Sequence, residues 1–204
     1  MSLQVTTVPP LTGKQPTGLI VVLHGWGANA QDLVPLVPVV NLPNYQFIFP
    51  NAPFPHPYNS TGRAWYDLSD RKHQGYAESR QMLKDWLLSL ESSTGIPLSR
   101  TVLSGFSQGG AMTLDVGLNL PLAGLMSLSG YLHPISQVAE LQFSPVLIVH
   151  GRQDTVVPLQ AAQYARDNLV ALGVSVEYHE FDMGHEIRPE VLPVLQNFIL
   201  EVTK

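Results

Sequence analysis

The stretch RTVLSGFSQGGAM, residues 100–112, decides the fold that we predict for this chain of 204 residues. Its first part, residues 101–104, is short, apolar and partly β-branched, which is typical of a buried strand. From Gln108 onward, apolar residues at helical spacing predict a helix. Residues 105–109 therefore carry the sequence G-x-S-x-G at a sharp turn from a strand into a helix.

Ser107 is the candidate nucleophile on this turn. A serine at such a position has a strained backbone, and its hydroxyl points away from the sheet. Gly105 and Gly109 leave room for the close approach of strand and helix, where a Cβ atom would collide. Unpaired N–H groups at the start of the helix favour negative charge that develops nearby. The alternative is a chance match in a chain with 16 glycines, but the flanking strand and helix favour the catalytic turn.

The composition fits one globular α/β domain spanning residues 1–204. Hydrophobic residues make up 45% of the chain and charged residues 13%, and this length can bury a sizeable core. The net charge is −5 without a run of Lys or Arg, which gives no footprint for nucleic acid. The absence of cysteine excludes disulfides, a cysteine nucleophile and thiolate metal sites.

The sequence contains no segment typical of a secretory leader or a membrane span. The first 18 residues lack a basic region followed by a long apolar run, and no stretch reaches about 18 apolar residues. We therefore expect a cytoplasmic protein without stable membrane insertion.

Strands and helices are expected to alternate along the chain. Continuous apolar runs predict buried strands at 19–23, 45–49, 101–104, 124–128 and 146–150, and an alternating pattern predicts a half-exposed strand at 174–178. Helices are expected at 75–90, from 108 onward, at 159–172 and at 190–200, and a weak signal allows an edge strand before residue 18. This order indicates a mostly parallel sheet with helices on both faces.

A long proline-rich loop, residues 50–74, interrupts this alternation. Loops of this length are uncommon in compact domains and are often functional. Trp65 and Tyr66 in this loop either line a pocket or anchor the loop to the core, and the sequence leaves both interpretations open.

His185 is the candidate base that would take the proton from Ser107, because a serine hydroxyl alone is a poor nucleophile. It follows a glycine and lies between the last strand and the last helix, at the carboxyl edge of the sheet. The other six histidines have simpler interpretations as turn residues whose rings bond loop backbone (His24 and His150), as solvated loop residues (His56, His73 and His133) or as an exposed strand residue (His179).

The acid that orients this histidine is expected to be Asp154, which follows a strand at the same edge. Asp182 and Asp115 are weaker candidates, because Asp182 would more easily cap its own turn and Asp115 points off the site. The order Ser107, Asp154, His185 is that of the α/β-hydrolase fold. Two backbone N–H groups are needed for the oxyanion, and we expect them from Gln108 and Trp26.

Six blocks of sequence, taken together, resemble the phospholipase/carboxylesterase family, which includes the acyl-protein thioesterases. They are LHGWGANAQD (23–32), RAWYDL (63–68), GFSQGGAM (105–112), SLSGYL (127–132), HGRQDTVVP (150–158) and MGHEI (183–187). The resemblance implies the α/β-hydrolase fold without a large lid domain, and its motifs match the triad and oxyanion positions named above. The family usually has leucine at the position of Trp26, so the bulkier indole implies a different acyl pocket.

These observations predict a serine hydrolase that cleaves carboxylic esters, with thioesters and lysophospholipids as further candidates, and without a metal or cofactor. Its partner would be a small acyl ester. The pocket residues that we expect are Trp65, Tyr66, Tyr131 and Met183. Two alternatives remain open: a ligand-binding protein with little turnover, and an acyltransferase that uses the same triad.

Overall fold

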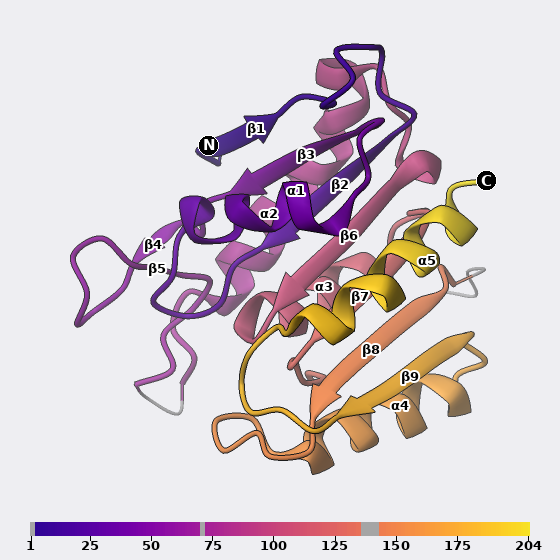
Figure 1. Ribbon diagram of the computed structural model, residues 1–204. Coiled ribbons are helices and arrows are strands. Elements are labelled where there is room, and N and C mark those ends of the chain that lie inside the picture. Colours follow the sequence, from indigo (N-terminus) through magenta and orange to yellow (C-terminus); the bar gives the residue numbers. More distant parts are fainter. Residues whose placement is uncertain (1–2, 70–71, 136–142) are drawn as a thin grey trace.

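A seven-stranded sheet forms the centre of the computed structural model, which describes residues 3–69, 72–135 and 143–204 (Figure 1). Its order is β1-β3-β2-β6-β7-β8-β9. β1 pairs antiparallel with β3, and every other neighbouring pair is parallel, which confirms the predicted mostly parallel sheet. The strands are β1 (Val5–Val8), β2 (Gly18–Leu23), β3 (Tyr45–Pro50), β6 (Thr101–Phe106), β7 (Gly124–Leu128), β8 (Val146–Gly151) and β9 (Val176–Phe181).

Helices cover both faces of this sheet, because successive strand residues point to opposite sides. In β2, Leu19 and Val21 pack into one core cluster and Ile20 into the other. The first cluster includes residues of α2 (Tyr76–Thr94), α3 (Gln108–Gly117) and α4 (Leu159–Ala171). The second includes residues of η1 (Ala30–Leu36), α1 (Val37–Val40) and α5 (Leu192–Val202).

Most of the predicted helices begin and end close to the expected residues. Leu83, Leu87 and Leu90 form the buried stripe of α2, as their spacing predicts. Pro193 lies in the first turn of α5, where a proline is tolerated. One detail was wrong: Leu172 ends α4 as its C-cap and is exposed, so it does not extend the buried face of that helix.

Short elements complete the chain. The loop 50–74 contains a two-stranded sheet of β4 (Phe54–Pro55) and β5 (Arg63–Ala64). The 3-10 helices η2 (Leu98–Arg100) and η3 (Pro189–Val191) precede β6 and α5. Among the helices of the described residues, none has the length and apolar character needed to cross a membrane.

The parallel strands bring their carboxyl ends to one edge of the sheet (Figure 1). The turns that follow β2, β6, β8 and β9 carry Trp26, Ser107, Asp154 and His185. Ligands of open α/β sheets bind at this edge, so the topology gathers these four residues where chemistry is expected.

Candidate active site

Ser107 lies between β6 and α3 with φ 55° and ψ −119°, a conformation that L-residues rarely adopt. The tight turn depends on its flanking glycines. A Cβ atom on Gly105 would collide with the backbone of Gly109, and one on Gly109 would collide with the carbonyl of Leu23. The N–H of Ser107 donates to the carbonyl of Leu128 at 2.8 Å, which fixes the turn against the end of β7. The strained strand-to-helix turn predicted from G-x-S-x-G is therefore present.

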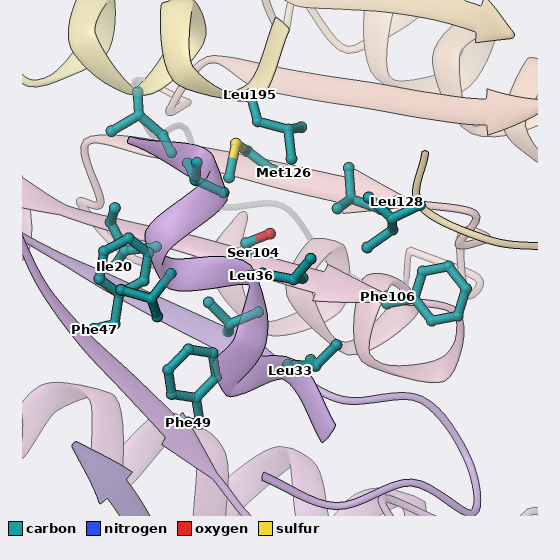
Figure 2. Close-up of a pocket in the computed structure, with 15 residues that line it drawn as sticks. Ile20, Leu33, Leu36, Phe47, Phe49, Ser104, Phe106, Met126, Leu128 and Leu195 are labelled. Atoms are coloured by element: carbon teal, nitrogen blue, oxygen red, sulfur yellow. The ribbon is translucent and has the colours of Figure 1, made fainter. Parts of the chain in front are cut away.

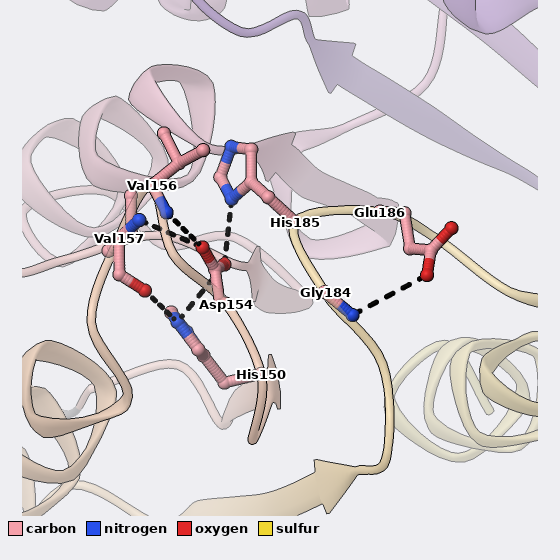
Figure 3. A network of polar contacts seen from close by, with 7 residues as sticks. All are labelled: His150, Asp154, Val156, Val157, Gly184, His185 and Glu186. Atoms are coloured by element: carbon pink, nitrogen blue, oxygen red, sulfur yellow. Dashed lines mark hydrogen bonds and ion pairs between the residues drawn. The ribbon is translucent and has the colours of Figure 1, made fainter.

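Asp154 holds the imidazole of His185, with Oδ2 of the carboxylate 2.7 Å from Nδ1 (Figure 3). Its other oxygen, Oδ1, accepts hydrogen bonds from the N–H groups of Val156 (2.9 Å) and Val157 (2.8 Å). Burial acts to raise the pKa of Asp154, but the hydrogen bond from His185 and those from Val157 and Val156 outweigh it and lower the pKa. The carboxylate is therefore kept ionised beside the imidazole.

His150 is a third member of this network, and its contact with Asp154 was not predicted. Its Nε2 lies 2.8 Å from the carbonyl of Val157 and 3.4 Å from Oδ2 of Asp154 (Figure 3). Because a carbonyl only accepts, Nε2 carries the hydrogen and presents it toward both oxygens. The expectation that the His150 ring bonds loop backbone is confirmed, and the HGRQD sequence was the available signal for the added contact.

Ser107 and His185 line the same open cleft, together with Gly25, Trp26 and Tyr131. The remaining lining is mostly apolar and includes Leu33, Leu68, Phe106, Val156 and Val157. The ring of Phe106 lies 4.8 Å from that of His185, which holds the imidazole beside the nucleophile turn. The cleft therefore combines the candidate nucleophile and base with room for an apolar group.

The turn after β2 packs directly against the nucleophile. A Cβ atom on Gly25 would lie 3.2 Å from Cβ of Ser107, so only glycine allows this approach without displacement. Trp26 follows Gly25, lines the cleft and packs edge-on against His56 at 4.3 Å between ring centroids. Gln108 begins α3 directly after Ser107. Both residues that we expect to supply oxyanion N–H groups thus flank Ser107.

The buried side chain of Gln108 ties α3 to the loop 50–74. Its Oε1 accepts from the N–H of Trp65 at 3.0 Å, and its Nε2 donates to the carbonyl of Tyr66 at 2.8 Å. We had expected little constraint on this side chain, since the predicted role uses only the backbone. The amide instead fixes the loop beside the nucleophile turn.

Three of the four predicted pocket residues lie outside the cleft lining, and only Tyr131 belongs to it. Trp65 is fully buried, and its Nε1 donates to the carbonyl of His24 at 3.0 Å. Tyr66 is equally buried, and its hydroxyl bonds those of Tyr131 and His133 Nε2. The interpretation of the two aromatic residues as loop anchors is therefore correct. Met183 belongs to the core beneath the site and is also not a pocket residue.

His133 is a further correction, because we expected a solvated side chain and it is only 8% exposed. Its Nε2 lies 2.9 Å from the Tyr66 hydroxyl, and its ring packs against Tyr76 at 4.5 Å. Burial, with smaller contributions from His73 and Arg80, lowers the pKa of His133 to about 4. His24 behaves as predicted: its ring bonds backbone atoms of Gly25 and Ala52.

The competing acids are engaged elsewhere. Asp182 is exposed and pairs with Arg152 at 2.7 Å. Asp115 lies on α3 and pairs with Arg80 of α2 at 3.1 Å. Within residues 3–69, 72–135 and 143–204, no cluster of three His, Asp or Glu side chains has the arrangement needed to hold a metal ion.

Comparisons with known proteins agree on one group of relatives. A family model described as "Phospholipase/Carboxylesterase" matches residues 10–203. The acyl-protein thioesterase 1 of Neurospora crassa is 30% identical over 213 residues, covering 91% of this chain and 86% of that protein. Among solved structures, esterase PE8 is 31% identical with a TM-score of 0.89 and covers 99% of this chain and 100% of its own. Arabidopsis thaliana SOBER1 is 27% identical with a TM-score of 0.79 and coverages of 92% and 99%.

Proposed function

Because this chain belongs to the phospholipase/carboxylesterase family, we propose that it hydrolyses carboxylic esters with Ser107 as nucleophile, His185 as base and Asp154 as orienting acid. The chain is a serine hydrolase with the α/β-hydrolase fold. One observation carries the residue roles. Ser107, on its strained turn, lines the same cleft as His185, whose Nδ1 is held by Asp154. The other ring nitrogen, Nε2, is thereby left for the serine.

In the first half of the reaction, Oγ of Ser107 attacks the acyl carbonyl carbon while Nε2 of His185 takes the hydroxyl proton. The carbonyl oxygen becomes an oxyanion and receives hydrogen bonds from the N–H groups of Trp26 and Gln108. Collapse of this intermediate breaks the bond to the leaving group, which takes the proton back from His185. The products are an alcohol and an acyl ester on Ser107.

In the second half, water replaces the alcohol. His185 removes a proton from water as the oxygen attacks the acyl carbon, and the same two N–H groups hold the second oxyanion. Collapse returns the proton to Oγ of Ser107 and releases the carboxylic acid. Asp154 remains ionised throughout and stabilises the imidazolium that forms twice in each cycle.

Thioesters are the second substrate class that we propose. The Neurospora relative carries the name acyl-protein thioesterase 1, and a thiolate leaves more readily than an alkoxide in the same mechanism. The apolar part of the cleft lining suits an acyl chain or the apolar part of a leaving group. The expected location in the cytoplasm remains a prediction.

Hydrolysis of p-nitrophenyl acetate and octanoate by the wild-type chain and by Ser107→Ala tests this function. Removing a triad nucleophile costs about 10³- to 10⁶-fold in turnover, so the variant should be nearly inactive on both esters. Ser89→Ala, at an exposed serine of α2, is the matched control and should retain activity. Equal rates for the wild type and Ser107→Ala would reject the proposal, as would an inactive wild-type protein.

A further inference from the structure

A second cavity lies inside the molecule, between the sheet and the elements η1, α1 and α5 (Figure 2). It encloses about 40 Å³, which is more than one water molecule needs. Fourteen of its 15 lining residues are apolar, and Ser104 is the one with a polar side chain. A cavity with such walls does not hold water well and accepts apolar groups.

This cavity is continuous with the catalytic cleft at two side chains. Leu33 and Phe106 line both spaces. Phe106 immediately precedes Ser107, and Ile187, another lining residue, follows His185 by two positions. One end of the cavity therefore lies next to the proposed nucleophile and base.

The wall over this end consists of η1, which is suited to small displacements. η1 is a 3-10 helix of seven residues with Pro35 inside it. Runs of 3-10 helix longer than three or four residues are uncommon, because their hydrogen bonds have poor geometry. Leu33 and Leu36 of this segment are only partly buried. A chain that passes Leu33 would thus displace a weakly held wall and leave the strands of the sheet in place.

We propose that this cavity receives the far end of an unbranched acyl chain whose carbonyl carbon is attached to Ser107. The inference rests on the proposed function and adds the substrate class: linear acyl esters longer than acetate. The chain would pass between Leu33 and Phe106, while the open cleft at Trp26, Tyr131 and Val156 takes the leaving group. A branched acyl group is too wide to pass between the two side chains.

The lining determines this choice of occupant. A charged or hydrogen-bonding ligand would lose its solvation against fourteen apolar side chains and find one hydroxyl in return. A methylene group gains from burial, by about fourfold in affinity for each CH₂. The expected result is a kcat/KM that rises from acetate to octanoate.

Two substitutions would fill the cavity from the sheet side. Val22 and Ser104 are register neighbours on β2 and β6, and both line the cavity. In Val22→Leu and Ser104→Val, the ratio of kcat/KM for octanoate to that for acetate should fall by about tenfold or more, the effect of burying roughly two fewer methylenes. Ser89→Val, on the exposed face of α2, should leave the ratio at its wild-type value.

Leu36→Ala provides the opposite change, and it remains informative if a filled variant does not fold. Leu36 is partly buried, so its truncation enlarges the cavity at modest cost in stability. The preferred chain should then lengthen from octanoate toward decanoate. Unchanged octanoate-to-acetate ratios in folded Val22→Leu and Ser104→Val, or an unchanged optimum in Leu36→Ala, would overturn the inference. Failure of the proposed function would appear separately, as acetate hydrolysis that does not depend on Ser107.

Discussion

The imidazole of His150 lies against the carboxylate of Asp154, with Nε2 3.4 Å from Oδ2 and both side chains fully buried. The same Oδ2 lies 2.7 Å from Nδ1 of His185. His150 therefore acts on the proposed base through Asp154, and we regard it as a positioning residue.

Replacing His150 with phenylalanine should lower kcat/KM by about ten- to a hundredfold, because a hydrogen-bond donor to a charged group is lost from a buried site. The acid limb of the pH–rate profile should also move to higher pH, since the pKa of Asp154 rises when a donor is removed. His150→Gln, which restores an N–H donor, should recover part of both effects. A variant with lower activity but an unmoved pH profile would indicate a purely structural role.

The lowered pKa of Asp154 predicts how this carboxylate contributes to stability. A carboxyl group whose pKa is lower in the folded state stabilises the fold above its unfolded pKa, and this contribution is lost as the pH falls through the folded value. The free energy of unfolding of wild type should therefore exceed that of Asp154→Asn at pH 7, and the difference should shrink on acidification to about pH 3. Urea unfolding at a series of pH values measures it. A difference that grows toward low pH would contradict this account.

The buried His133 predicts a second pH dependence with its own signature. Its pKa is about 4 in the folded protein and near 6.5 when unfolded, so the unfolded state binds more protons between these values. The contribution of His133 should make the free energy of unfolding fall as the pH decreases through this window. His133→Gln, which keeps a polar partner for the Tyr66 hydroxyl, should show a smaller slope. Identical slopes for the two proteins would show that His133 is not buried in its neutral form.

The amide of Gln108 should contribute strongly to stability, because it satisfies backbone groups of Trp65 and Tyr66 in the core. Gln108→Ala leaves both unpaired, at a cost of about 1–3 kcal/mol for each. Chemical unfolding measures the loss. Gln81→Ala, at an exposed residue of α2, is the control and should change stability by less than about 0.5 kcal/mol. A small effect of Gln108→Ala would mean that solvent reaches the loop.

The sequence predicted the residues of the cleft that depend on strand order alone. Ser107, Asp154 and His185 each follow a parallel strand, so their meeting at one sheet edge follows from topology. The burial of Trp65 and His133 depends instead on partners far along the chain. Trp65 bonds Gln108, 43 residues away, and His133 bonds Tyr66, 67 residues away. Local composition carries no signal for such contacts, which explains why a polar-looking loop residue proved to be buried.

The interior cavity was beyond sequence analysis for a related reason. Its walls come from strands and helices that are separately predictable, such as β2 and α5. The space between them depends on how Leu33 and Leu36 of the 3-10 segment pack against Phe106 and its neighbours. Hydrophobic periodicity predicts which residues face inward, but it does not predict an incompletely filled contact.

The central claim is that Ser107 forms a covalent acyl-enzyme, and its most direct test is labelling with an activated alkyl phosphonate followed by intact and peptide mass spectrometry. The phosphorus takes the place of the acyl carbon, and the adduct cannot be hydrolysed by the second half of the cycle. The account predicts one equivalent of label on the peptide that contains Ser107, and none in Ser107→Ala. Label on another residue, or equal labelling of the variant, would contradict it.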